Sequence, residues 1–294
     1  MGAAEAAELI AAGLRRAAPG TALDLMPVAD GGDGLVDVLL ARRGGRRVRL
    51  RVLGPLGERR MADYALLDDG RTAVIEMARA SGLALVPAGR RDPLGATSFG
   101  TGELIADALR RGRGRILVGL GGSAANDGGA GMAQALGARL FDGEGRELAR
   151  GAAPLGRLAR LELAGLRARL GRSRLIGISD VRNPLLGPLG SARVYGPQKG
   201  ATPGQVAVLE LALTRWAALL GPSSARLPGA GAAGGMGFGL AAALGASLVA
   251  GAAWVLDELG AEARVRRARL VVTGEGALDA SSFFGKAPIE LVRL

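Results

Sequence analysis

Hydrophobic positions repeat along the chain with two different periods. Apolar residues at helical spacing predict five helices, and shorter apolar runs bounded by turn residues predict strands. The predicted helices cover residues 3–17, 33–42, 101–112, 204–220 and 239–259. The predicted strands cover residues 22–28, 46–53, 61–67, 72–77, 114–120, 174–179 and 268–273. This alternation of strands and helices is typical of an α/β fold with a parallel sheet.

The segment 46–77 has a different pattern. Val48, Leu50 and Val52 alternate with arginines, which is the period of a strand with one buried face. The Asp-Asp-Gly turn at 68–70 then separates two further strands in the manner of a hairpin. We therefore expect an antiparallel hairpin inside the otherwise parallel architecture.

The longest uncharged stretch, residues 227–256, is long enough to span a bilayer. Between Gly229 and Ala253, however, it holds eight Gly and ten Ala, which favour membrane insertion much less than Leu, Ile or Phe do. A glycine-rich loop followed by the buried helix 239–259 explains the stretch better. With no signal peptide visible after Met1, the sequence predicts a cytoplasmic protein without a membrane partner.

The composition narrows the possible chemistry. The 294 residues include no Cys and no His, which excludes thiol nucleophiles, imidazole acid–base catalysis and the usual zinc sites. Catalysis must use carboxylates, Lys or Arg, hydroxyls, backbone amides and a hard cation such as Mg²⁺. Phosphoryl transfer is the reaction class that commonly works with this set of groups.

The net charge of +11 permits a nucleic-acid binder, but the sequence does not favour one. The arginines are scattered singly and in pairs, and only 3% of residues are aromatic, which leaves few rings for base stacking. Of the 38 basic residues, only Lys199 and Lys286 are lysines. Both lie beside glycines in predicted loops, which favours a functional role for each.

Five segments combine glycines with polar residues, and three of them directly follow predicted strands. In open α/β sheets, ligands bind outside the carboxyl ends of strands, so these loops are candidate sites. The segments are 30–34, 119–129, 195–200, 229–239 and 274–276 with 285–286.

These loops can be compared with two standard nucleotide-binding motifs. The phosphate-loop pattern fails around Lys286, because Ala280 and Ala287 replace its first Gly and its Ser or Thr. The run Gly119-x-Gly121-x-x-Ala124 matches the dinucleotide fingerprint, with Asp142 near the ribose-binding spacing. An NAD(P)-dependent oxidoreductase is therefore the main alternative function, although further glycines weaken the helix that must begin there.

Carboxylates accompany these loops. Asp180 follows the strand 174–179 and Glu275 follows the strand 268–273, while Asp30 and Asp33 follow the strand ending at Val28. Together with the two lysines, these acids form a candidate site for a magnesium nucleotide and an anionic substrate.

These residues resemble the glycerate kinase family of the bacterial type I kind, in the same order along nearly the whole chain. The matching segments are 27–34, 54–57, 75–78 with 81–83, 119–132, 180–185, 195–201, 229–239 and 272–276 through 285–288. The resemblance implies transfer of the ATP γ-phosphoryl group to a hydroxyl of D-glycerate, giving a phosphoglycerate, commonly the 2-phosphate. It also implies two α/β domains with the site in the cleft. One is a Rossmann-like domain with a parallel sheet, here discontinuous and incomplete over 1–45 and 262–294. The other is an inserted mixed α/β domain over 46–261 that carries the antiparallel hairpin.

The same comparison suggests missing segments. Family members usually begin with a strand and an Asp-x-Phe-Lys-Gly-x-Leu segment and continue past the Gly-Lys-Ala-Pro segment that lies here at 285–288. We therefore expect truncation at both ends, and an inactive kinase fragment is a second alternative.

The resemblance and the chemistry together give an expected role to each candidate residue. The catalytic set is Asp180, Lys199, Lys286 and Glu275, with Asp180 taking or orienting the proton of the substrate hydroxyl. The nucleotide-binding set is Gly121, Gly122, Ser123, Asn126, Asp127, Gly128 and Gly129. The substrate-binding set is Asp30, Gly31, Gly32, Asp33, Arg182 and Asn183. Glu275 and Asp127 are the candidate Mg²⁺ ligands, ATP and Mg²⁺ are the expected cofactors, and the oligomeric state stays open.

Overall fold

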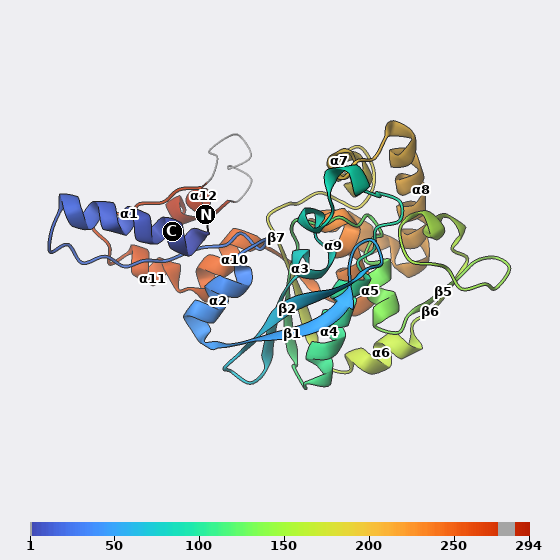
Figure 1. Ribbon diagram of the computed structural model, residues 1–294, viewed down its shortest axis with the longest axis horizontal. Coiled ribbons are helices and arrows are strands. Elements are labelled where there is room, and N and C mark those ends of the chain that lie inside the picture. The colour runs from blue at the N-terminus through green and yellow to red at the C-terminus, as the bar shows by residue number, and fades with distance from the viewer. Residues whose placement is uncertain (1, 276–285) are drawn as a thin grey trace.

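The computed structural model describes residues 2–275 and 286–294 as a mixed α/β fold, shown in Figure 1. The main sheet has six strands in the order β1-β2-β3-β4-β7-β8, and β5 pairs with β6 in a small second sheet. The strands are β1 (Gly45–Leu53), β2 (Arg59–Leu67), β3 (Thr72–Glu76), β4 (Arg115–Gly119), β5 (Arg139–Phe141), β6 (Arg160–Glu162), β7 (Arg174–Ser179) and β8 (Ser247–Ala250). The α/β class predicted from the sequence is confirmed.

The helices fill the connections between these strands. They are α1 (Ala3–Ala17), α2 (Leu35–Arg43), α3 (Ala78–Ser81), α4 (Phe99–Arg110), α5 (Ala130–Ala135), α6 (Ala164–Leu170), α7 (Ser191–Tyr195), α8 (Pro203–Leu220), α9 (Ala232–Leu244), α10 (Gly251–Glu258), α11 (Ala261–Val265) and α12 (Ala287–Val292). Short 3-10 turns occur at 83–85, 88–90, 153–157, 197–199 and 222–226.

The sheet combines antiparallel and parallel pairing. β1, β2 and β3 form an antiparallel meander, and β3, β4, β7 and β8 run parallel to one another. The predicted hairpin is therefore present, with Gly70 at φ +69° in the turn between β2 and β3. Four parallel strands end at the same edge of the sheet, and this edge carries the candidate site.

Two hydrophobic cores cover the faces of the sheet. On one face, α2 and α10 contribute Leu35, Leu39 and Val255 to a cluster that includes Val74 of β3 and Ile178 of β7. On the other face, side chains of α4, α5, α8 and α9 pack against the sheet in a larger cluster. Burial of these apolar side chains is the main contribution to the stability of the fold.

Two predicted strands are wrong. Residues 22–28 and 268–273 form no strand, and Leu270 and Val272 are 76% and 53% exposed. A strand needs a neighbour that accepts and donates ladder hydrogen bonds, and neither segment pairs with one among the described residues. Apolar content alone therefore predicted strands that have no partner.

The predicted helix 239–259 is also wrong, because the chain folds there as helix, strand and helix. α9 already begins at Ala232, has left-handed backbone conformations at 233–235, and ends at Leu244, where the following Gly245 with a φ of +65° stops the helix. β8 then pairs in parallel with β7, and α10 begins at Gly251. Glycine is needed at 251 because a Cβ there would lie 1.6 Å from the carbonyl oxygen of Asp30.

α1, α11 and α12 gather with both chain ends on one side of the molecule, away from α8 (Figure 1). Leu256, Ala261 and Leu291 form a small core there with Met26 and Val28. The predicted division into domains 1–45 with 262–294 and 46–261 stays a prediction, although α2 of the first packs on β2 and β3 of the second.

Two further points concern membrane-spanning helices and the motif residues near Lys286. In the described residues, no helix is both long enough and apolar enough to cross a membrane. Gly276, Ala280 and Gly285, which the motif comparisons used, lie outside the described residues.

Candidate active site

The loop 30–34 lies against the carboxyl ends of the central strands. A Cβ added to Gly31 would lie 2.7 Å from a side-chain carbon of Ile178, and a Cβ added to Gly121 would lie 2.9 Å from the Cα of Gly32. Only glycines permit these close backbone approaches. The sequence-predicted segments 30–34 and 119–129 are therefore brought together, although they are far apart along the chain.

A cavity of about 150 Å³ opens beside this contact. Its lining includes Asp180 from the end of β7, Lys199, Tyr195 and Ser123. The other lining residues are Leu83, Leu120, Gly121, Gly122, Val181, Gln198, Ala233 and Gly234. Five sequence-predicted site residues from three segments of the chain thus share one small cavity: Gly121, Gly122, Ser123, Asp180 and Lys199.

The carboxyl group of Asp180 is held in an unusual electrostatic environment. Burial raises its pKa, and the nearby negative charge of Asp30 raises it further, while Lys286 lowers it. Asp30 and Lys286 are therefore both close enough to act on Asp180. A carboxyl group that has a raised pKa and lies at the carboxyl end of a strand is a candidate proton acceptor.

Lys199 is almost completely buried, with 2% of its surface exposed. Its Nζ donates a hydrogen bond to the carbonyl oxygen of Ala125 at 2.6 Å. Burial lowers the pKa of Lys199 to about 7, and the negative charge of Asp127 opposes this shift. The ammonium group can therefore lose its proton near neutral pH, unlike an ordinary lysine.

Tyr195 was missed as a site residue, although its segment was singled out. Its hydroxyl donates a hydrogen bond to Oδ1 of Asn183 at 2.7 Å, and burial raises its pKa to about 12, assisted by Asp180. Asn183 in turn donates from Nδ2 to the carbonyl oxygen of Leu189 at 2.8 Å. The available signal was the position of Tyr195 next to Gly196 and near Lys199.

Asp127, by contrast, points into the protein. Its carboxylate accepts hydrogen bonds from the Ser98 amide at 2.8 Å, the Ser98 hydroxyl at 3.0 Å and the Gly129 and Gly131 amides at 3.1 and 3.2 Å. Burial raises its pKa, and these hydrogen bonds lower it. This geometry favours a structural role, and its assignment as a Mg²⁺ ligand stays untested.

Three other predicted nucleotide contacts also lie behind the cavity. The Gly128 amide donates to the Gly234 carbonyl at 3.0 Å, and the Gly129 amide is bonded to Asp127. The Asn126 Nδ2 donates to the carbonyl oxygen of Pro93 at 3.2 Å. The donors that were expected to face a nucleotide are thus used inside the protein.

The remaining predicted residues are not among those that line the cavity. Lys286 Nζ is 3.5 Å from the Glu275 carboxylate, with 25% and 16% of the two side chains exposed. Asp33 and Arg182 are exposed. Among the described residues, no group of three or more Asp or Glu side chains is arranged to hold a metal ion.

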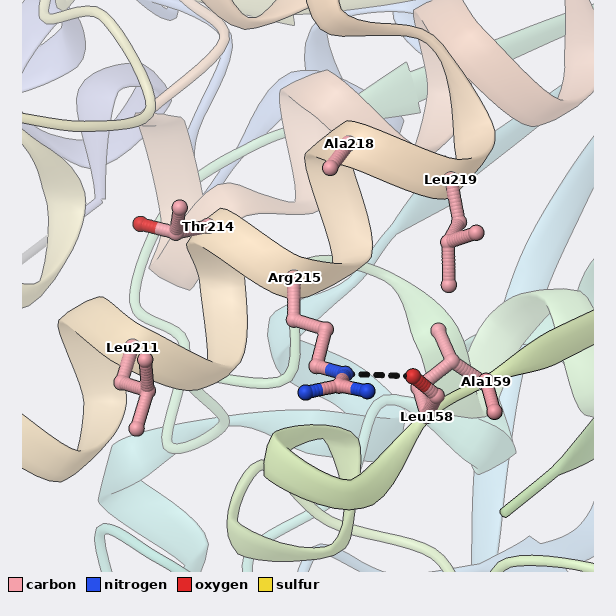
Figure 2. A pocket seen from close by; sticks show the side chains of 7 residues that line it. All are labelled: Leu158, Ala159, Leu211, Thr214, Arg215, Ala218 and Leu219. Carbon is pink, nitrogen blue, oxygen red and sulfur yellow. Dashed lines mark hydrogen bonds between the residues drawn. The ribbon is translucent and has the colours of Figure 1, made fainter. Parts of the chain in front are cut away.

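A second, larger groove lies elsewhere, with a volume of about 420 Å³. Figure 2 shows Arg215 of α8 reaching across it, where its Nε donates to the Leu158 carbonyl oxygen at 2.5 Å. The other lining residues are Ala159, Leu211, Thr214, Ala218 and Leu219. This groove contains no carboxylate or lysine, so size alone does not identify the site.

The dinucleotide fingerprint does not lead into a helix. Residues 120–129 form a loop after β4, and α5 begins only at Ala130. A pyrophosphate site of that type needs the helix N-terminus directly after the glycines.

Comparison with known proteins identifies the class of protein. The family model described as "Glycerate kinase family" matches residues 1–294. A glycerate kinase of Bacillus subtilis (strain 168) is 46% identical over 297 residues, covering 100% of this chain and 78% of the relative. A glycerate 2-kinase of Escherichia coli (strain K12) is 45% identical, covering 98% of this chain and 77% of the relative. A crystal structure assigned as glycerate kinase 2 of Salmonella typhimurium LT2 has a TM-score of 0.88 at 47% identity, and the match covers 99% of this chain and 79% of that one.

These matches define the chain as a phosphotransferase. It belongs to the glycerate kinase family. The phosphate donor is accordingly ATP, and the acceptor is the small molecule glycerate. The alternative of an NAD(P)-dependent oxidoreductase is wrong. The family match extends over residues 1–294 and gives no support to the expected truncation at both ends.

Proposed function

We propose that the chain transfers the γ-phosphoryl group of magnesium ATP to the 2-hydroxyl of D-glycerate, in the cavity between Asp180 and Lys199. The observation that carries this proposal is that a carboxylate and a buried ammonium group line the same small cavity. The printed name of the E. coli relative, glycerate 2-kinase, supports the 2-hydroxyl as the acceptor.

Asp180 acts in this proposal as the general base. Its raised pKa makes it a better proton acceptor than an ordinary carboxylate. As the hydroxyl oxygen of glycerate bonds to the γ-phosphorus, the bond from that phosphorus to the bridging oxygen breaks. ADP leaves with those electrons, and the hydroxyl proton passes to Asp180.

Cationic side chains neutralise the charge of the phosphates and of the substrate. Lys199 lines the cavity, where the negative charge of bound phosphates would favour its protonated form, and Lys286 is close enough to Asp180 to lower the pKa of that carboxyl group. We assign Arg182, which is exposed two residues past Asp180, to the glycerate carboxylate. Gly121, Gly122 and Ser123 form the wall along which we place the nucleotide phosphates.

The Glu275 carboxylate fits a magnesium ion that is held mainly by ATP. Mg²⁺ commonly takes one or two protein carboxylates and completes its octahedral shell with phosphates and water. Glu275, next to Lys286, is a carboxylate of this kind, whereas the Asp127 oxygens are occupied by internal donors. When bound, Mg²⁺ neutralises charge on the phosphate oxygens.

The loop 30–34 forms the substrate side of the site. Asp30 is close enough to Asp180 to raise its pKa, and its own Oδ1 accepts a hydrogen bond from the Gly32 amide at 3.3 Å. We therefore assign Asp30, Gly31 and Gly32 to contacts with the glycerate hydroxyls. Asp33 is exposed.

Product analysis tests this proposal. The purified chain is incubated with ATP, Mg²⁺ and either D- or L-glycerate, and ADP release is followed with a coupled assay. The product is then examined by proton-coupled phosphorus NMR. A 2-phosphate couples to the single proton on C2 and gives a doublet, whereas a 3-phosphate couples to two protons on C3.

We expect a doublet, D-glycerate-dependent ADP release and loss of activity with EDTA. A triplet would contradict the assignment of the hydroxyl, preference for L-glycerate would contradict that of the enantiomer, and full activity in EDTA would contradict the role of Mg²⁺.

A further inference from the structure

Glu76 is a buried carboxylate at the end of β3, with 1% of its surface exposed. Its Oε1 accepts a hydrogen bond from the Val36 amide at 2.8 Å, and its Oε2 accepts one from Nε of Arg79 at 2.9 Å. It is absent from the lining of the cavity and has no assigned part in the reaction. A buried charge is costly unless it is fully paired, so this arrangement requires an explanation.

The partner of Glu76 lies in the first turn of α2. The amides of a first helical turn have no partner inside the helix, and a side chain just before the helix usually accepts from one of them. Gly34 precedes α2 with φ +91° and has no side chain for this purpose. Glu76 supplies the missing acceptor from 40 residues away, and its negative charge also favours the helix N-terminus.

α2 directly follows the loop 30–34, which carries Asp30. Gly31 is in close contact with Ile178, and Gly251 leaves room for the carbonyl oxygen of Asp30. These contacts support the loop from the sheet and from α10. Glu76 fixes its other end, because the loop continues into the helical turn that Glu76 holds.

We propose that Glu76 is a positioning residue, which caps α2 from the end of β3 and thereby holds the loop 30–34 against the cavity. It acts on glycerate binding through this loop and touches neither substrate. This inference rests on the proposed function, in which the loop 30–34 forms the glycerate side of the site.

Three variants test the role of Glu76. Glu76→Gln keeps one acceptor oxygen for the Val36 amide and loses the charge, whereas Glu76→Ala removes both hydrogen bonds. Asp107→Asn is the matched control, because Asp107 is also a buried carboxylate, bonded to the Tyr64 hydroxyl at 2.8 Å and to Arg110 and Arg111. Asp107 lies on α4 and does not line the cavity.

Each variant is assayed for kcat and for KM of both substrates, and amide hydrogen exchange is measured by mass spectrometry without ligands. We expect Glu76→Gln to raise KM for glycerate by about tenfold or more, with a smaller change in KM for ATP. Peptides covering 29–39 should exchange faster. Glu76→Ala should show larger effects, and Asp107→Asn should leave exchange at 29–39 and KM for glycerate unchanged.

If Glu76→Gln lowers stability as Asp107→Asn does but changes neither KM for glycerate nor exchange at 29–39, the inference is wrong. The Asp30→Asn variant separates this result from a failure of the proposed function. If Asp30→Asn binds glycerate normally while Glu76→Gln speeds exchange at 29–39, the cap on α2 is real and the placement of glycerate beside the loop is wrong.

Discussion

The Nζ atom of Lys199 and the carbonyl oxygen of Ala125 form a 2.6 Å hydrogen bond in the wall of the cavity. The same carbonyl also accepts from the hydroxyl of Ser123 at 3.1 Å. Lys199 thus joins the 3-10 turn at 197–199 to the loop that follows β4. One side chain holds the loop in place and also supplies charge to the cavity.

Lys199→Arg should therefore lower kcat/KM by about a hundredfold or more, although Arg replaces Lys at almost every other basic position. A planar guanidinium is bulkier than an ammonium, and Nζ is already only 2.8 Å from where a Cβ on Gly234 would lie. Steady-state kinetics check this prediction, and a Lys199→Arg variant that folds normally and keeps wild-type kcat/KM would contradict it.

The stability of the folded chain should depend on pH through Lys199. Burial lowers the pKa of Lys199 to about 7, from 10.5 in the unfolded chain. Between these values the unfolded state binds the additional proton, so the free energy of unfolding rises with pH across this window. Below pH 7 both states are charged, and the folded state bears the full cost of the buried charge.

We test this with urea unfolding of the wild type and Lys199→Met at pH 6.5, 8 and 9.5. The free energy of unfolding of the wild type, relative to Lys199→Met, should increase over this series. A difference that stays constant with pH would show that the pKa of Lys199 is not lowered.

Asp127→Asn should reduce stability without changing the magnesium requirement. An Asn side chain has one acceptor oxygen, so amides of Ser98, Gly129 or Gly131 would be left buried without a partner, at a cost of about 1–3 kcal/mol. Urea unfolding measures this cost. Titration of the activity with Mg²⁺ then tests the role, since a marked rise in the half-maximal concentration would identify Asp127 as a metal ligand.

Ala233→Gly should stabilise the chain by about 1 kcal/mol, because a left-handed conformation is costly for a residue with a Cβ. Ala233 lines the cavity with φ +55° and is the one non-glycine residue with a positive φ in the described structure. Its neighbour Ala232 is buried at the first position of α9 and lies outside the left-handed run 233–235, so Ala232→Gly should instead destabilise the chain through the greater freedom of Gly in the unfolded state. Thermal unfolding of both variants checks the opposite signs.

The sequence predicted five of the six strands of the main sheet and four of the helices, because their periodicity reflects burial. β1 to β4, β7, α1, α2, α4 and α8 occur where their apolar patterns placed them. The strand β8 was missed because residues 247–250 are only four long and are enclosed by Ala and Gly, which show no period. The strands predicted at 22–28 and 268–273 were wrong for a different reason. An apolar pattern cannot show whether a neighbouring strand is present to pair with.

The site was predictable as a set of segments but not in its internal geometry. Asp180 and Lys199 line the cavity because strand ends and glycine loops converge at one edge of the sheet. Asp127 also lies in a glycine-rich segment that follows a predicted strand. Its carboxylate nevertheless accepts a hydrogen bond from Ser98, which is distant along the chain. Glu76 lies in the matching segment 75–78, but the sequence did not indicate its hydrogen bond to Val36, which is an ordinary helical amide.

The most direct test of the central claim is the kcat of Asp180→Asn at saturating ATP, Mg²⁺ and D-glycerate, compared with the wild type. Asn is nearly isosteric but cannot accept the hydroxyl proton, so we predict a fall in kcat of at least about a hundredfold. The circular dichroism spectrum, the unfolding midpoint and KM for ATP should stay close to wild-type values. A variant that folds normally and retains near-full kcat would contradict the assignment of Asp180 as the general base.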